Sequence, residues 1–226
     1  MSQGVFETVL VLDGVPVELD AHLTRLRASL GTLFPDHPPP NVDVPPRGRP
    51  YGPPGDGTSV GALRIAVAPA AHGGLEARVE QREAPRGGTA SLASVTAPGG
   101  LGGHKWVDRS LLDEAQAALP GDALPLIVDS DGAVLEASRA NLFAVLEGVL
   151  HTPPLDGRIL PGVTRARVIE RADSAAIPVH ERALSRDDLL AADEVFLTGS
   201  VRGIEPATSL DGTALGDERR VSDALR

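Results

Sequence analysis

The chain has 226 residues, of which 42% are hydrophobic and 23% are charged, as expected for a folded globular protein. A net charge of −10 at pH 7 and an aromatic content of 3% argue against nucleic acid as a partner, because nucleic-acid surfaces need clustered basic and stacking side chains. The chain contains no cysteine, which excludes disulfides, thiolate metal sites and cysteine nucleophiles.

The N-terminal region predicts a β-hairpin followed by a helix. In VFETVLVLDGVPVEL, alternating side chains and the pair Asp13-Gly14 between two apolar runs are typical of a hairpin. Leucines at helical spacing then predict a helix over residues 19–34. Residues 35–59 hold many of the chain's 20 prolines and predict an irregular, polyproline-like segment.

Two further strands, ALRIAVAP and LEARVEQREAP, predict a second antiparallel pair. A short strand ASVTAP and the glycine-rich GGLGG follow, and this change of composition indicates a joint between two subdomains. We therefore expect a small N-terminal α/β subdomain over residues 1–97, which contains the proline-rich loop 35–59, and a larger subdomain over residues 98–226.

The larger subdomain mixes helices and strands without regular alternation. This pattern predicts an α+β fold with a mixed β-sheet or barrel and covering helices, rather than a regular parallel α/β fold. We expect helices over residues 108–119, 163–173 and 186–193, and strands over residues 124–130, 133–146, 148–153, 177–185 and 194–200.

Lys105 is the only lysine, and the other 20 basic residues are arginines. Arginine keeps its proton at working pH and cannot form a Schiff base, whereas a partly desolvated lysine can lose its proton and can form one. Lys105 is therefore a candidate for covalent chemistry, although most lysines in proteins are solvated surface groups.

Other positions could hold an anion or a heterocyclic nitrogen. A helix that starts after Gly162 points the amides of Val163 and Thr164 outward at its positive end, where phosphates bind, although such a start is also a common helix cap. Glu136 lies in an otherwise apolar strand, where a solvated edge position is the alternative to a functional role. An amine, a phosphate site and a buried carboxylate together match the three groups by which a protein can bind pyridoxal phosphate (PLP), which are its aldehyde, its phosphate and its ring nitrogen.

These motifs resemble the class IV, fold-type IV, PLP-dependent aminotransferases, a family that includes D-amino-acid and branched-chain aminotransferases and aminodeoxychorismate lyase. The resemblance covers nearly the whole chain outside residues 35–59. It is carried by VFETVLVLDGVPVELDAHLTRLRASL, HKWVDR, DGAVLEASRANLFAV, LPGVTR and EVFLTGSVRGIEPATSLDG, in the family's order. It implies two subdomains of the D-amino-acid aminotransferase type, and a homodimer.

The resemblance also implies roles for individual residues. Lys105 would bind the aldehyde of PLP covalently and then move protons, and Glu136 would pair with the pyridine nitrogen. The phosphate would be held by a set that combines an arginine, helix amides and small residues: Arg25, Val163, Thr164, Gly199 and Ser200. On position alone, Arg25 would be a solvated arginine on a helix face.

The substrate is an anionic amine on this interpretation. Four residues, Arg64, His104, Arg109 and Arg202, could bind its carboxylates, although arginines beside strands are often solvated. Aminotransferases of the family commonly have a tyrosine soon after the lysine, whereas this chain reads WVDRSLL there, and its only tyrosine is Tyr51. The GSVRG stretch also resembles lyase sequences.

We therefore expect a 4-amino-4-deoxychorismate lyase, which releases pyruvate and forms the folate precursor 4-aminobenzoate. The alternatives are a D-amino-acid or branched-chain aminotransferase, and an inactive remnant with a regulatory or assembly role. The remnant is suggested because family members usually carry a further strand before the VFET hairpin. The sequence shows neither a membrane span nor a signal peptide, so a cytoplasmic location and no metal, membrane or nucleic-acid partner are expected.

Overall fold

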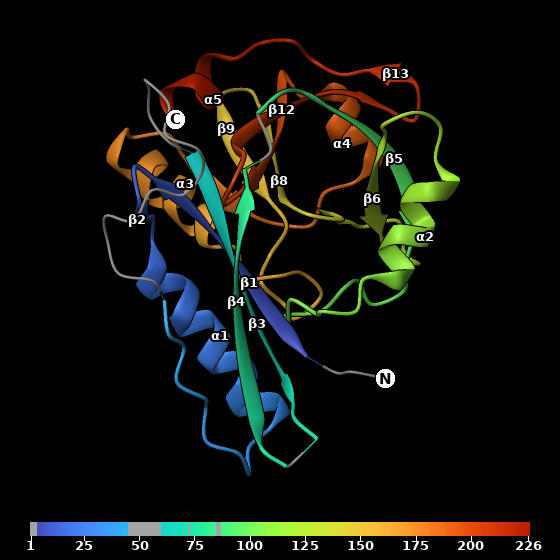
Figure 1. Cartoon of the computed structure of the whole chain (residues 1–226). Helices are drawn as coiled ribbons and strands as arrows, with labels where there is room; N and C mark the ends of the chain where they lie inside the picture. The colour runs from blue at the N-terminus through green and yellow to red at the C-terminus, as the bar shows by residue number, and fades with distance from the viewer. Residues whose placement is uncertain (1–3, 45–59, 72, 85–86) are drawn as a thin grey trace. The chain divides into compact units, whose positions relative to one another are not determined.

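The computed structural model describes residues 4–44, 60–71, 73–84 and 87–226. The chain forms two compact units, and each is described by itself below (Figure 1). The first unit comprises Met1–Arg86 and His104–Arg109, and the second comprises Gly87–Gly103 and Ser110–Arg226. The expected boundary was 97/98, whereas this division falls at 86/87, and HKWVDR belongs to the first unit. Most of the expected loop, residues 45–59 with Tyr51, lies outside the described residues.

In the first unit, a four-stranded antiparallel sheet carries one helix on one face, as Figure 1 shows. The predicted hairpin and helix are confirmed. The elements of the unit, within the described residues, are β1 (Val5–Leu12), β2 (Val15–Pro16), α1 (Leu19–Leu33), β3 (Val60–Pro69) and β4 (Leu75–Glu83), with the sheet order β2-β1-β3-β4.

Alternation along the strands gives this sheet two different faces. One face of β1 and β3 contributes fully buried aliphatic side chains, which pack against Leu26 and Leu30 of α1. Phe6 and Arg64 occupy the opposite face, because each lies one residue away from members of that core. The first unit therefore has an apolar face under α1 and a second face with an aromatic and a cationic side chain.

In the second unit, a nine-stranded mixed sheet forms the framework of the described residues. Its main order is β10-β9-β8-β11-β12-β5-β6-β7, with β13 paired to β12, and β5 runs parallel to both β6 and β12. The strands are β5 (Ala90–Thr96), β6 (Leu124–Val128), β7 (Val134–Ala137), β8 (Asn141–Leu146), β9 (Val149–Thr152), β10 (Val179–Glu181), β11 (Glu194–Gly199), β12 (Gly203–Leu210) and β13 (Thr213–Ala214).

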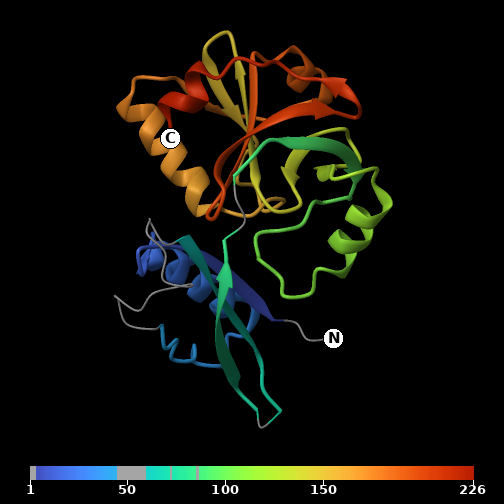
Figure 2. The same cartoon turned by 45° about the horizontal axis from the view of Figure 1, so that its top comes forward.

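Helices cover this sheet, with α3 along one side of the strands in Figure 2 and α2 near β6. The stacked rings of Phe143 and Phe196 lie in the apolar cluster that includes Val168 and Ala172 of α3. None of the helices among the described residues is long and apolar enough to cross a membrane. The helices of this unit are α2 (Ser110–Ala118), α3 (Val163–Ser174), α4 (Arg186–Ala191) and α5 (Arg220–Ala224).

The expected single strand over residues 133–146 is wrong, because the chain turns back on itself after Ala137. Ala137 and Ala140 exchange both backbone hydrogen bonds across a tight turn, which separates β7 from β8. Local alternation could not show this turn, because its residues include neither glycine nor proline. The turn brings the last strand of the sheet path back to β8, so the sheet curls. The predicted α+β fold with a mixed, barrel-like sheet is confirmed.

The glycine-rich segment after β5 packs tightly within the second unit. Gly100 has a φ of +72°, and a Cβ built on it would collide with the Arg158 carbonyl oxygen and, at 2.7 Å, with Leu135 Cδ1. Gly102 also has a positive φ, +79°, but a Cβ there would meet no atom within 4 Å. Gly100 is therefore required by both conformation and space, and Gly102 by conformation only.

We predict that Gly100→Ala lowers the free energy of unfolding by about 2 kcal/mol or more, because overpacking adds to the strain of a left-handed alanine. Gly102→Ala is the matched control and should cost about 1 kcal/mol, the conformational part alone. Urea denaturation of the two variants measures the difference. Equal losses would contradict the assigned role of the Arg158 carbonyl contact.

Candidate active site

Lys105 is held in the first unit by backbone pairing with the start of β1. The Phe6 amide donates to the Lys105 carbonyl at 2.8 Å, and the Val107 amide donates to the Gly4 carbonyl at 2.8 Å. These bonds fix the backbone on both sides of the lysine. The Lys105 Nζ atom lies 5.0 Å from the centroid of the Phe6 ring, within the range of a cation–π interaction.

Arg64 shares the same aromatic ring. Its Cζ atom lies 3.7 Å from the Phe6 ring centroid. Burial lowers the pKa of Arg64 below its usual value, and the positive charges of Arg82 and Arg109 act in the same direction. The structure thus brings Lys105 and Arg64 together at Phe6, and it places Arg109 close enough to Arg64 for mutual repulsion.

The other two predicted substrate contacts are occupied by different partners. His104 Nδ1 lies 3.0 Å from the hydroxyl of Ser29, and its ring meets the ring of Trp106 edge to face. Arg202 belongs to the second unit and donates to Glu205 at 3.0 Å. His104 is therefore packed against α1, and Arg202 is part of an ion pair.

Arg25 is not a solvated arginine, because it forms a two-pronged ion pair with Glu7 of β1. Arg25 Nε and Nη2 donate to the two carboxylate oxygens at 2.8 and 2.6 Å, and His22 Nδ1 lies 2.7 Å from Glu7 Oε2. Burial alone would raise the pKa of Glu7, but the hydrogen bonds from His22 and Arg25 hold it below its usual value. An ionised Glu7 therefore orients the guanidinium of Arg25.

In the second unit, Glu136 is 4% exposed, so the solvated edge position considered from sequence is wrong. Asn141 Nδ2 donates to its Oε2 at 3.1 Å, and the Leu160 amide donates to its Oε1 at 3.1 Å. Asn141 Nδ2 also donates to the Leu160 carbonyl at 2.9 Å. The tight turn between β7 and β8 makes this possible, because it folds Asn141 back beside Glu136.

The start of α3 lies at the same network. The helix begins at Val163 as predicted, and Gly162 before it supplies no side chain that could cap the first amides, which include that of Thr164. A Cβ on Gly162 would collide with the amide oxygen of Asn141. Glycine at this position therefore lets Asn141 pack against the helix start. The first backbone N–H groups of α3 have no side-chain cap and point outward from the helix end, as they do in anion-binding sites.

Small residues at the end of β11 lie beside this network in the second unit. Thr198 is paired with Asn141 across the β8–β11 ladder, so both side chains lie on one face of the sheet. The Thr198 hydroxyl is buried and has no hydrogen-bond partner within the described part of the chain. Gly199 and Ser200 follow it directly. An unsatisfied buried hydroxyl beside a helix start fits a bound polar ligand.

Residues 52–210 match the model of the amino-transferase class IV family. The chain belongs to this family. The resemblance inferred from the five motifs is confirmed, and the class IV family comprises PLP-dependent enzymes, which include aminotransferases and lyases. The buried Glu136 carboxylate, the uncapped start of α3 and the unsatisfied Thr198 hydroxyl fit this cofactor, since it presents a ring nitrogen and a phosphate.

Proteins similar to this chain are named for different activities. The branched-chain-amino-acid aminotransferase of Escherichia coli (strain K12) is 41% identical over 110 residues, which are 49% of this chain and 36% of that protein. The match therefore spans about a third of that relative's length.

Solved structures match over nearly the whole chain. A putative 4-amino-4-deoxychorismate lyase from Legionella pneumophila has a TM-score of 0.82 at 24% identity, over 99% of this chain and 89% of that one. The 4-amino-4-deoxychorismate lyase of Pseudomonas aeruginosa has a TM-score of 0.73 at 26% identity, over 99% and 90% of the two chains. These likenesses establish the class IV fold.

Sequence reasoning missed the charged partners of the site. Glu7, Arg139 and Glu205 were not singled out, and each forms an ion pair; Glu7 and Glu205 are buried, whereas Arg139 is exposed. A usable signal existed for Glu205, because it is a carboxylate inside an apolar strand, as is Glu136. Arg139 gave no comparable signal, because its turn between β7 and β8 was not recognised.

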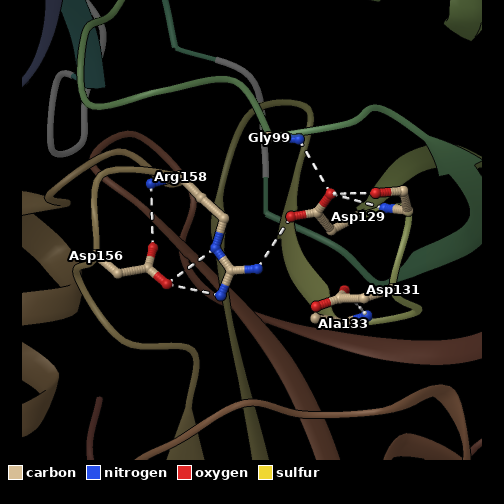
Figure 3. A network of polar contacts seen from close by, with 7 residues as sticks. Gly99, Asp129, Asp131, Ala133, Asp156 and Arg158 are labelled. Carbon is tan, nitrogen blue, oxygen red and sulfur yellow. Dashed lines mark hydrogen bonds and ion pairs between the residues drawn. The ribbon is translucent and has the colours of Figure 1, made fainter.

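A second polar network joins the loop before α3 to the glycine-rich segment that precedes Lys105 in the chain (Figure 3). Arg158 Nη1 donates to Asp129 at 3.0 Å, and Arg158 Nε donates to Asp156 at 2.9 Å. Asp129 also accepts from the Gly99 amide at 3.0 Å, and the Gly102 amide donates to the Arg158 carbonyl at 3.1 Å. One arginine therefore orders two loops of the second unit.

The hydrogen bond from the Gly99 amide, followed by those from Arg158 and Ser130, lowers the pKa of Asp129 to about 2. Because this value lies below the usual 3.8, the ionised Asp129 stabilises the folded state above about pH 4, and this contribution is lost as the pH falls through 2. We predict that Asp129→Asn is less stable than the wild type above about pH 4 and that the gap narrows towards pH 2. Urea denaturation across this range measures it.

Asp131→Asn is the control for removing one charge from the same turn, because Asp131 accepts from the Ala133 amide and not from Arg158. A gap between Asp129→Asn and the wild type that stays constant from pH 5 to pH 2 would contradict the assigned network.

Proposed function

We propose that the chain is a PLP-dependent 4-amino-4-deoxychorismate lyase. The observation that carries the cofactor assignment is the buried Glu136 carboxylate, fixed by Asn141 and the Leu160 amide beside the uncapped start of α3. The lyase assignment rests on the stretch after Lys105, which has no tyrosine as far as residue 118, and on the lyase-like GSVRG. The likeness to the lyase of Pseudomonas aeruginosa supports it.

On this proposal, the residues divide into a phosphate-binding and a ring-binding group. Arg25, oriented by Glu7, would hold the phosphate together with the amides of Val163 and Thr164 and with Gly199 and Ser200. A charged partner for phosphate is expected, because an anion must be bound in a chain of net charge −10. Glu136 would accept a hydrogen bond from the protonated pyridine nitrogen and so keep the ring protonated.

The bound cofactor supplies an electron sink for the carbon atoms next to the substrate amine. Lys105 would supply the amine that binds the aldehyde of the cofactor and that moves protons at the substrate. This amine would take a proton from the substrate ring and return one to the three-carbon side chain, so that the carbon–oxygen bond breaks and pyruvate and 4-aminobenzoate form. Atoms balance without an added oxidant, because one molecule is divided into two.

An aminotransferase for branched-chain or D-amino acids is the second candidate. It is favoured by the 41% identity to the branched-chain enzyme of Escherichia coli (strain K12). It would use Lys105 for the same first half of the reaction and would then transfer the amino group to a 2-oxo acid. Both candidates imply a small anionic amine as substrate and, from the resemblance, a homodimer, whose size sedimentation can measure.

We predict that purified protein with PLP gives a borohydride-stable cofactor adduct on the peptide that contains Lys105. The chain has no second lysine, so mass spectrometry can locate the adduct without ambiguity. Lys105→Ala should lower turnover by about 100-fold or more, because it removes the proton-transferring group. Lys105→Arg is the matched variant, which keeps the charge and cannot form the adduct. An adduct elsewhere, or none, would contradict the cofactor assignment and favour the inactive remnant.

A product assay then separates the two activities. With PLP and 4-amino-4-deoxychorismate, we expect one pyruvate for each 4-aminobenzoate. No pyruvate from this substrate, together with turnover of a D- or branched-chain amino acid with a 2-oxo acid, would establish the aminotransferase instead.

Glu136→Gln tests the partner of the ring nitrogen. The amide keeps the shape of the side chain and loses its negative charge, so we predict that PLP still binds and that kcat falls about 10- to 100-fold, the value of one charge-assisted hydrogen bond. Glu170→Gln, which removes an exposed carboxylate paired with Arg167 on α3, is the control. An unchanged kcat in Glu136→Gln would remove Glu136 from the site.

A further inference from the structure

The strand β4 forms an outer edge of the sheet in the first unit. Among the described residues its only strand partner is β3, at the end of the order β2-β1-β3-β4. All nine residues of β4 are exposed or partly exposed. Alternate residues of such a strand direct their backbone N–H and C=O groups away from the sheet, where another strand can bind them. β4 is therefore a candidate for pairing with a further strand.

One face of β4 carries charges of alternating sign. Glu76, Arg78, Glu80 and Arg82 occupy every second position, so their side chains lie on the same face. Arg78 Nε lies 3.6 Å from Glu76, and Arg82 Nη2 donates to Glu80 at 2.8 Å. The four side chains are between 53% and 73% exposed. The edge strand thus presents two positive and two negative charges to the solvent.

The order of these charges is the complement of itself when two copies of β4 run antiparallel. A two-fold axis through Val79 places each residue opposite the one that lies equally far from Val79 on the other side. Arg82 then faces the partner's Glu76, and Glu80 faces the partner's Arg78. Each of these contacts occurs twice by symmetry, so every charge on this face meets one of opposite sign.

The same charges act against other registers. A shift of two residues in either direction places like charges opposite each other, which is unfavourable. A shift of one residue turns the charged face of one copy towards the opposite face of the other. Charges of one sign would keep two copies of an edge strand apart, whereas this alternation attracts them in a single register.

The other face of β4 is compatible with this register. Leu75, Ala77 and Val79 pack against the core under α1. A two-fold axis perpendicular to the sheet keeps the corresponding faces of both copies on the same side, so Val79 meets the partner's Val79. Ala77 meets the partner's Gln81, so no charge is placed against the apolar centre of the contact.

We propose that β4 pairs antiparallel with β4 of a second copy of this chain, centred on Val79, so that the two sheets become continuous. The occupant is a second copy because the charge order of β4 is complementary to its own. The homodimer implied by the resemblance does not by itself identify this surface. The proposal uses none of the residues proposed to bind PLP.

Reversal of two charges far apart on the strand tests the pairing. Glu76 and Arg82 lie about 20 Å apart in one strand, because each residue advances it by about 3.4 Å, so they cannot touch within one chain. Glu76→Arg or Arg82→Glu alone places like charges opposite each other twice. We expect either variant to raise the dissociation constant of self-association by about tenfold or more. The double variant restores opposite charges and should recover most of this loss.

Sedimentation velocity over a range of protein concentrations measures the dissociation constant, and loss of the β4 contact halves the mass of the assembly. Arg167→Glu on α3 is the matched control, because Arg167 is 52% exposed and pairs with a glutamate, as Arg82 does. It makes the same charge change as Arg82→Glu, and we expect no effect on self-association.

A cysteine on the two-fold axis gives an independent test. The chain has no cysteine of its own. Directly opposite residues of antiparallel strands have Cα atoms about 4.5–5.5 Å apart, which is within the range of disulfides. Val79→Cys should therefore give a disulfide-linked dimer on mild oxidation. Gln81→Cys is the control and should not, because position 81 faces the partner's Ala77.

A monomer at every concentration, equal cross-linking of the two cysteine variants, or a double charge variant no better than the single ones would overturn the proposal. Melting temperatures show whether each variant folds, and if Val79→Cys does not fold, the charge variants carry the test. The PLP spectrum of the same samples separates this result from the proposed function. Normal PLP binding with self-association that ignores the charges rejects only the β4 contact, whereas no PLP binding in the wild type rejects only the proposed function.

Discussion

The buried carboxylate of Glu136 is the constraint on which the candidate site residues of the second unit depend. Burying an ionised carboxylate costs several kcal/mol unless hydrogen bonds compensate. Here Asn141 and the Leu160 amide provide them, and Asn141 fits only because position 162 is glycine. One charge thereby determines the turn between β7 and β8, the loop before α3 and the start of that helix.

Other buried carboxylates of the chain are also compensated by hydrogen bonds or ion pairs. Glu7 is paired with Arg25 and His22, Glu205 with two arginines, and Glu194 accepts from the amides of Val221 and Ser222 at the start of α5. Arginine suits this structural work, since it stays charged and its planar donors match a carboxylate. Lys105, the single primary-amine side chain, takes no part in these pairs.

Class IV membership determines the cofactor but not the reaction, because the family includes both lyases and aminotransferases that use PLP. The difference must lie in the groups that meet the substrate. Arg64 and Lys105 share the Phe6 ring in the first unit, and Arg139 and Arg202 share Glu205 in the second. In each unit two cations therefore lie close together, and the pair in the second unit shares a carboxylate that is 2% exposed.

The sequence by itself determined the fold class, most of the elements and the family, because hydrophobic periodicity, turn residues and short motifs such as LPGVTR are local properties. It also singled out Lys105 and Glu136 by residue type alone. Only the tertiary structure decided that residues 133–146 turn back at Ala137, that Arg25 is paired with Glu7, and that Arg139 and Arg202 meet on Glu205. These pairings depend on strand register and on contacts between distant segments, which the pattern of neighbouring residues does not encode.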